Sequence, residues 1–226
     1  MPSRRKSLMF ASASFVSVCS FVIVCLVLAT RNWVSSKINY SERNSTVAVS
    51  ISYGLFQGVC FKTAQAGLGK EETPFQVFDN LEHAKLRSFN VVIIVLLVIS
   101  LLSSLLSSIF TGLNALSNPY QTFLGPIGVY TWNSICGISS LLTLILFPVN
   151  VEANKLSTEL AIKPCMSSRQ SKQSSTYGYS YWIILLIVLC NAATIIIIVF
   201  YQQARYSERK ERERTIESAP KDGILF

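Results

Sequence analysis

The sequence has few charged residues, one histidine and no recognisable catalytic motif. Only 14% of its 226 residues are charged, whereas soluble domains contain roughly 25%. A Cys/His metal site needs several clustered ligands, and the chain offers one histidine, His83. The chain also lacks a Gly-rich phosphate loop, a Cys-x-x-Cys pair and a Gly-x-Ser-x-Gly elbow. Because proton transfer needs positioned titratable groups, we expect no enzyme activity, no cofactor, no metal and no nucleic-acid partner.

Charge and histidine are also absent from four long apolar stretches. Each has the roughly 20 residues needed to cross a hydrocarbon core of about 30 Å, and in lipid a single segment satisfies its backbone as a helix. The sequence therefore predicts an all-α membrane protein, a bundle of four transmembrane helices at residues 9–29, 91–113, 123–148 and 181–201. The segments between and around them are an N-terminus, a first loop, a short turn, a second loop and a tail, at residues 1–8, 30–90, 114–122, 149–180 and 202–226. A cleaved signal peptide has a shorter apolar core, so we expect the first span to be retained.

Two glycosylation sequons orient the chain. Asn39-Tyr-Ser and Asn44-Ser-Thr both lie in the first loop, and a loop that carries N-linked glycans faces the outside of the cell. Asn44 is the better acceptor because Asn39 is nearer the membrane. Basic residues flank the first and last spans, and such clusters are attracted to the anionic cytoplasmic leaflet. We therefore predict cytoplasmic termini in a multi-pass protein of the plasma membrane, in contact with membrane lipids.

The two outer loops carry weaker structural signals. Thr46–Leu55 alternates apolar residues with small or polar ones, a period of two that predicts a half-buried strand. Phe75–Phe78 is a weaker strand candidate to pair with it. Since an isolated hairpin is marginally stable, we expect a small extracellular sheet resting on the helices. Val149–Ile162 is expected to be helical, and Met166–Thr176 a flexible Ser/Gln-rich tether.

A stripe of small residues follows one face of the second span. Its members recur at spacings of three and four: Ser100, Ser103, Ser104, Ser107, Ser108, Thr111 and Gly112. Small residues let membrane helices approach closely, and hydroxyls can bond across the contact. Helix packing is the preferred interpretation, and a hydrophilic pore lining is the alternative.

Other polar and cysteine residues are interpreted by their positions. Asn133 and Asn191 lie inside spans and are expected to bridge helices rather than bind an ion. Cys60 and Cys165 are the two cysteines of the outer loops. Disulfides persist outside the cell. A disulfide between the two loops is therefore one hypothesis, and two free thiols are the alternative.

Several motifs resemble one family. Trp33, Gly54-Leu-Phe56 and Cys60 look like the W…GLW…C pattern of the claudin-like four-pass superfamily. Tyr53–Gly58, together with segments 118–126 and 179–182, is more specifically similar to the clarins. The resemblance implies a claudin-like bundle and a non-enzymatic organiser, since other clarins are associated with sensory hair cells and actin-rich membranes. Two departures stand out: the second loop-1 cysteine of claudins is missing, and Phe56 replaces their tryptophan.

Two functions compete at this point. The leading hypothesis is a scaffold that assembles membrane or cytoskeleton-linked proteins, and the alternative is a channel subunit or channel regulator. The C-terminus adds a candidate partner, because Ile224 and Phe226 are apolar at alternate positions before a free carboxylate. Such a peptide can add as a strand to a PDZ domain. An apolar tail without a partner is the competing interpretation.

Overall fold

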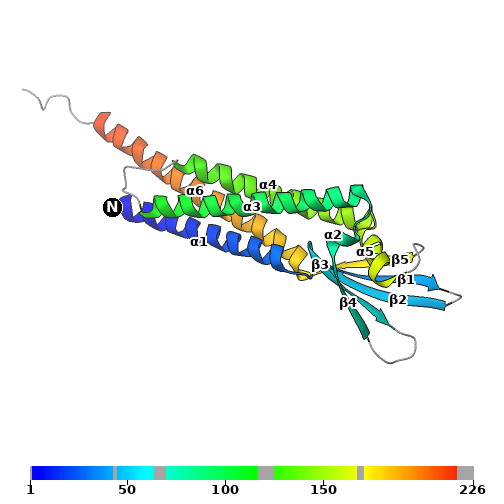
Figure 1. Cartoon of the computed structure of the whole chain (residues 1–226). Coiled ribbons are helices and arrows are strands. Elements are labelled where there is room, and N and C mark those ends of the chain that lie inside the picture. The colour runs from blue at the N-terminus through cyan, green and yellow to red at the C-terminus, as the bar shows by residue number, and fades with distance from the viewer. Residues whose placement is uncertain (1, 43–44, 64–69, 117–124, 167–170, 218–226) are drawn as a thin grey trace, which may run out of the picture.

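In a computed structural model, four long helices lie side by side and a sheet caps one end of them (Figure 1). The structure describes residues 2–42, 45–63, 70–116, 125–166 and 171–217. The helices are α1 (Pro2–Ala29), α3 (Ala84–Leu116), α4 (Gly125–Glu152) and α6 (Tyr179–Glu217). All four are long and apolar enough to cross a membrane, which confirms the predicted fold class. We call the two ends of the bundle the sheet end and the tail end.

The bundle buries small polar residues and turns large apolar ones outward. On α3, Ser103 and Ser107 are at most 2% exposed, whereas Leu102 is 55% exposed and Ile109 is 46% exposed. A water-soluble helix shows the opposite pattern. In lipid there is no hydrophobic drive between helices, so small residues occupy the contacts and apolar side chains face the tails. The helices form a ring in which α1 and α4 each pack against α3 and α6.

The helices extend beyond the apolar stretches from which the spans were predicted. α3 continues to Leu116, so Asn114–Leu116 are helical rather than part of the predicted turn. α4 passes through Pro148 to Glu152. α6 includes the charged segment Arg205–Glu217, which belongs to the predicted tail of residues 202–226. Span prediction counts apolar residues, whereas backbone hydrogen bonding continues into polar sequence.

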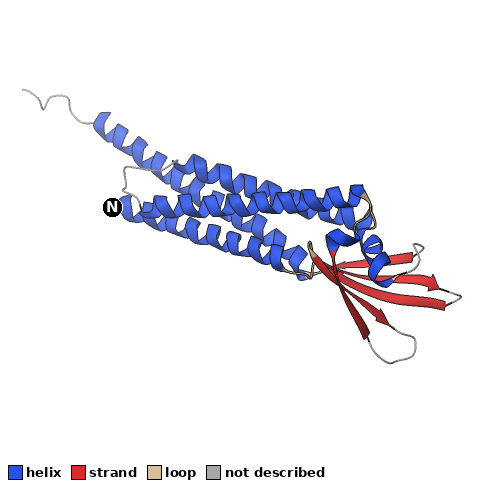
Figure 2. Cartoon of the chain, in the orientation of Figure 1, coloured by secondary structure: helices blue, strands red, loops and turns tan. Residues whose placement is uncertain are grey.

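The sheet has five antiparallel strands at the sheet end (Figure 2). They are β1 (Val34–Glu42), β2 (Ser45–Tyr53), β3 (Gln57–Thr63), β4 (Lys70–Gln76) and β5 (Ser171–Tyr177), in the spatial order β4-β3-β2-β1-β5. β2 coincides with most of the predicted strand, and its alternate residues Val49, Ile51 and Tyr53 are buried. Four strands come from the first loop, and β5 comes from the second.

Two expectations for the loops were wrong. Ser171–Tyr177, most of it within the predicted flexible tether, is a strand whose backbone pairs with β1 from Tyr40↔Ser171 to Val34↔Tyr177. The predicted strand Phe75–Phe78 is divided, because β4 ends at Gln76 and Val77 begins the short helix α2 (Val77–Asn80). β4 pairs with β3 and not with β2. For β5 the paired backbone of β1 decided the structure, since the serines and glutamine of β5 carry little strand signal. For Phe75–Phe78 the pairing with β3 ends at Gln76, and the chain then turns into α2.

A second short helix, α5 (Leu156–Cys165), packs on the sheet. The predicted helix over Val149–Ile162 is therefore interrupted, because α4 ends at Glu152 and Lys155 takes a left-handed conformation with φ 53°. Pro164 lies inside the last turn of α5 rather than after it. One large core runs from the sheet into the bundle. A smaller core at the tail end contains Phe10, Ala13, Val129, Ile198 and Tyr201.

Candidate functional site: the sheet platform and the bundle contacts

The five strands, α2 and α5 form one unit, which we call the sheet platform, and Trp33 fixes it to the bundle. Its indole Nε1–H donates a 3.1 Å hydrogen bond to the carbonyl of Val27, in the last turn of α1. Its ring lies 4.8 Å from the ring of Phe147, edge to face. Trp33 is fully buried. Trp33 thus joins α1 and α4 to the start of β1.

The Gly-Leu-Phe segment lies against the same junction. A Cβ on Gly54 would come within 2.6 Å of the Thr30 carbonyl oxygen and 2.9 Å of the Arg31 Cα, so only glycine fits. Leu55 is 1% exposed, and its carbonyl accepts a 3.3 Å hydrogen bond from the Asn90 side chain of α3. Phe56 is 41% exposed. The segment therefore tethers the platform and leaves one aromatic side chain on the surface.

Phe56 borders a groove of about 400 Å³ at the edge of the bundle. The other residues of the groove come from the end of α1, the two residues that follow it and the start of β3: Leu28, Ala29, Thr30, Arg31 and Gln57. The groove combines apolar side chains with one arginine. We call it the sheet-end groove.

A polar cluster joins α5 to three strands. The Ser157 hydroxyl of α5 lies 2.7 Å from the Tyr53 hydroxyl and 2.8 Å from the Ser36 hydroxyl. Ser36 also donates to Ser175 of β5 at 2.9 Å. Burial raises the pKa of Tyr53 above its ordinary value, so this phenol remains protonated and can donate a hydrogen bond. The cluster orders α5 on β1, β2 and β5.

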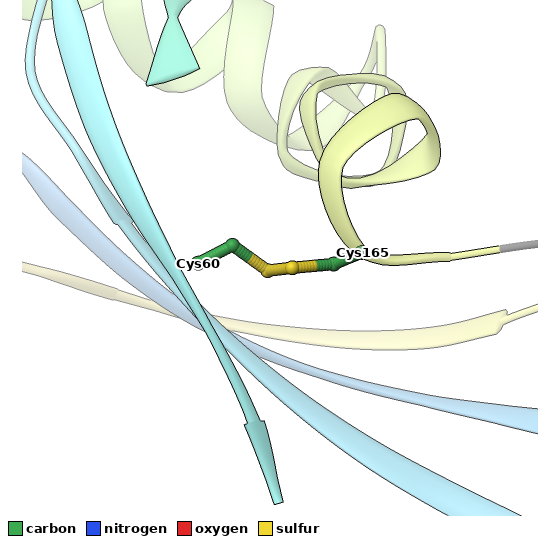
Figure 3. Close-up of a disulfide and its surroundings, with 2 residues drawn as sticks. All are labelled: Cys60 and Cys165. Atoms are coloured by element: carbon green, nitrogen blue, oxygen red, sulfur yellow. A yellow bond between two sulfur atoms is a disulfide. The ribbon is translucent and has the colours of Figure 1, made fainter. Parts of the chain in front are cut away.

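Cys60 of β3 and Cys165 at the end of α5 form a disulfide (Figure 3). The bonded residues are 105 positions apart, and both are nearly fully buried. The bond joins the two loops at the side of the platform remote from β5. A covalent link and the Ser157 cluster thus hold α5 at different strands.

The end of β5 is tied back to the bundle. The Gly178 N–H donates to the Trp33 carbonyl at 2.8 Å, and a Cβ on Gly178 would collide with the Asn32 carbonyl oxygen. The Tyr177 hydroxyl donates to Glu152 of α4 at 3.3 Å. Partial burial and the nearby Glu152 charge raise the pKa of Tyr177 to about 12.

Asn133 and Asn191 bridge helices inside the bundle. The Asn133 amide of α4 donates to Ser107 of α3 at 2.6 Å, and Ser107 lies 3.2 Å from Ser17 of α1. The Asn191 amide of α6 donates to Ser20 of α1 at 3.2 Å and to the Cys136 sulfur of α4 at 3.3 Å. These polar groups hold four helices in register.

The predicted stripe on α3 divides into two kinds of residue. Ser100 bonds across to α4, at 3.1 Å to Ser140, and Ser107 bonds to α1 and α4. Ser103 and Ser104 are buried, although the Ser104 hydroxyl bonds to its own helix at Leu101. Ser108 is only half-buried and bonds to its own Leu105 carbonyl. Ser108 therefore lies at the margin of the stripe rather than in a helix contact.

The stripe ends with Thr111, which bonds within α3, and Gly112, which lies beside α1. Thr111 is buried, and its hydroxyl bonds to its own helix at Ser107. A Cβ on Gly112 would lie 3.5 Å from the Ser14 hydroxyl of α1, an ordinary contact distance. Gly112 therefore allows approach without requiring glycine.

Other predicted residues are scattered. Asn39 is exposed in β1, between β2 and β5. Asn44, Ile224 and Phe226 lie outside the described residues. His83 is exposed, and its Nε2 lies 3.6 Å from Glu159 of α5. Among the residues that the structure describes, no group of three His, Cys, Asp or Glu side chains could hold a metal ion.

Sequence reasoning missed the residues that hold α5. Ser36, Ser157 and Ser175 belong to three separate segments of the chain, and an isolated serine in a polar loop gives no signal. Gly178 was likewise overlooked. The alternation of β1 was the one available clue, since Val34, Ser36 and Ile38 are all buried on one side.

Comparisons with known proteins agree with this architecture. The family model described as Clarin-2-like matches residues 5–199. The chain is 42% identical to Clarin-3 of Mus musculus and 44% identical to Clarin-3 of Homo sapiens, over 100% of both chains in each case. It is 30% identical to Clarin-2 of Homo sapiens, over 85% of this chain and 87% of the relative. The resemblance predicted from the sequence motifs is confirmed.

Proposed function

The chain belongs to the clarin family of tetraspan membrane proteins, and we propose that it is a non-enzymatic scaffold that assembles other membrane or cytoskeleton-linked proteins in the plasma membrane. The observation that supports this most is the way the sheet platform is fixed to the bundle. Trp33 and Gly54 hold it against the end of α1, and the bond between Cys60 and Cys165 fixes α5 to β3 within the platform. A preordered surface binds with less loss of conformational entropy.

We place the partner contact at the sheet-end groove. Phe56 is exposed there beside Leu28 and Arg31, and aromatic and arginine side chains are enriched where proteins bind one another. The groove lies where α1 leaves the bundle, within reach of a second membrane protein. A partner helix that covers Phe56 would contact both the bundle and the sheet platform.

Affinity capture of the intact protein in mild detergent tests the scaffold. We expect a reproducible set of membrane or cytoskeleton-linked proteins, which Phe56→Ser should reduce at least severalfold. Tyr179→Ser is the matched control, because Tyr179 is an exposed aromatic residue at the same end but outside the groove. The absence of any reproducible partner would contradict the scaffold, and equal losses in both variants would contradict the groove.

The proposed orientation puts the sheet platform outside the cell and both termini in the cytoplasm. The two sequons at Asn39 and Asn44 and the basic clusters beside the first and last spans support it. Glycosidase treatment should increase gel mobility, and Asn44→Gln should lose part of that shift. A protein without any glycan in mammalian cells would remove the main support for this orientation.

The channel alternative finds less support in the bundle. The hydroxyls of Ser100 and Ser107 bond to neighbouring helices of the same chain, so they are already used in packing. Ion currents in reconstituted bilayers would separate the two functions. A current that Ser104→Leu abolishes would favour the channel.

A further inference from the structure

The helix α6 carries the chain well past the membrane at the tail end. Its 39 residues span about 58 Å at 1.5 Å per residue, against a hydrocarbon core of about 30 Å. Figure 1 shows α6 leaving the bundle at the end opposite the sheet. The apolar run ends at Tyr201, and Arg205 and Arg209 follow one and two turns later. This part of α6 therefore lies at headgroup level and just beyond it.

A groove of about 530 Å³ opens here between α6 and the start of α4. We call it the tail-end groove, and its lining residues are Pro126, Tyr201, Gln202, Gln203, Arg205, Tyr206 and Arg209. Its volume is in the range of small-ligand sites. The lining residues include two cations and two amides but no acidic side chain.

The base of the tail-end groove is held by the bundle. Tyr201 is 8% exposed, and its ring meets Phe10 of α1 edge to face at 5.0 Å. The Tyr130 hydroxyl of α4 donates to the Gln202 side-chain oxygen at 3.1 Å. That bond uses the acceptor of Gln202 and leaves its amide N–H groups as donors. Ordered aromatic and amide groups thus lie beneath the exposed arginines.

The two arginines are arranged for an anion. Arg205 and Arg209 are four residues apart and so share one face of α6, with Arg212 three residues further along that face. Glu208 and Glu213 flank this face. In the part of the chain that the structure describes, the ion pairs involve His83 and Lys163 and none of these arginines. The side chains of Arg205 and Arg209 are exposed. Each guanidinium group can bind a phosphate through two parallel N–H donors.

We propose that the tail-end groove binds the phosphorylated headgroup of a phosphoinositide lipid. Arg205 and Arg209 hold the phosphates, and the glycerol region lies against Pro126 and the Tyr201 ring. Phosphatidylserine fits less well, because its ammonium group needs an acidic partner and the groove lining has none. A free phosphate would leave the apolar wall of the groove uncovered. Basic residues beside a span generally attract anionic lipid, whereas this groove selects one kind of headgroup.

Titration of the purified full chain in detergent with a fluorescent short-chain phosphatidylinositol bisphosphate tests the proposal. The double variant Arg205→Gln, Arg209→Gln should bind at least roughly tenfold more weakly. The control Lys210→Gln, Arg214→Gln removes the same charge from the opposite side of α6 and should change affinity less than about twofold. All substituted residues are exposed, and an unchanged melting temperature will show that the bundle is intact.

Three outcomes would overturn the proposal. Equal weakening in the two double variants would mean diffuse attraction to charge rather than a site. Short-chain phosphatidylserine binding as tightly as the phosphoinositide would refute the headgroup selection. Free inositol trisphosphate binding as tightly as the lipid would refute the contact with the glycerol region. Because the assay uses detergent and no partner protein, neither the proposed orientation nor the scaffold function affects its result.

Discussion

The hydroxyl of Tyr181 on α6 donates a 3.0 Å hydrogen bond to the carbonyl oxygen of Leu144 on α4. Leu144 lies four residues before Pro148, which has no N–H to offer it. An unpaired carbonyl inside a membrane protein costs free energy. α6 thus supplies the donor that proline removes, and this helps α4 to continue through Pro148 to Glu152.

Removing the Tyr181 hydroxyl should therefore destabilise the bundle. We expect Tyr181→Phe to lower the free energy of unfolding by about 1–2 kcal/mol, measured by denaturation in detergent. In a Pro148→Ala background the alanine N–H can bond to Leu144, so the same change should cost little. An equal loss in both backgrounds would show that Leu144 does not depend on Tyr181.

The bond between Cys60 and Cys165 predicts a clear dependence on both cysteines. Cys60→Ser or Cys165→Ser should remove the change in gel mobility on reduction and lower stability by about 2–5 kcal/mol, as is usual when a native disulfide is lost. Cys25→Ser is the control, because Cys25 is a free, exposed thiol of α1. If the two loop variants respond to reduction in the same way as the wild type, the bridge between Cys60 and Cys165 does not form.

Glycine is required at position 54 and not at position 137. Gly54→Ala places a methyl group 2.6 Å from the Thr30 carbonyl oxygen, and we expect a loss of about 1–3 kcal/mol from this overpacking. A Cβ on Gly137 would meet its nearest atom, the Asn191 Cβ, at 3.8 Å, so Gly137→Ala should be tolerated. Surface delivery and melting temperature give the readout. Tolerance of Gly54→Ala would mean that the platform can move away from α1.

Two serines of α3 should respond differently to leucine. Ser104 is 1% exposed, so Ser104→Leu should force neighbouring backbones apart and reduce surface delivery. Ser108 is half-buried, and Ser108→Leu should be delivered nearly as well as the wild type. Losing a hydroxyl contact in a membrane costs only on the order of 1 kcal/mol. The difference between the two variants therefore comes from the steric overlap of the larger leucine side chain. Normal delivery of Ser104→Leu would place this face against lipid.

The C-terminal residues Ile224 and Phe226 predict PDZ binding. A peptide covering 220–226 should bind with micromolar affinity to at least one PDZ domain that accepts apolar residues at both positions, because the domain holds the terminal carboxylate with backbone N–H groups. Amidation of that carboxylate is the matched control and should abolish binding. Binding that persists after amidation would indicate another mode of recognition.

Much of the bundle could be predicted because its signal is local. Four uncharged stretches of sufficient length require membrane helices, and the spacing of Ser100, Ser103 and Ser107 identified the inward face of α3. The same holds for the strand ending at Tyr53, whose alternation matches its buried side. The site was predicted less well. Trp33 was recognised only as part of a family motif, and its hydrogen bond to Val27 depends on where the chain turns after α1.

The number of spans, the inward small-residue faces and one strand follow from local pattern, because apolar length and period are properties of neighbouring residues. Ser171–Tyr177 is a strand for a different reason, since β1 supplies the backbone partners that its serines and glutamine do not specify. Tertiary contacts also bring the Ser157 hydroxyl to the Tyr53 hydroxyl, and they allow α4 to continue through Pro148. Each of these depends on a hydrogen-bond partner more than 30 residues away in the chain, which no local pattern can encode.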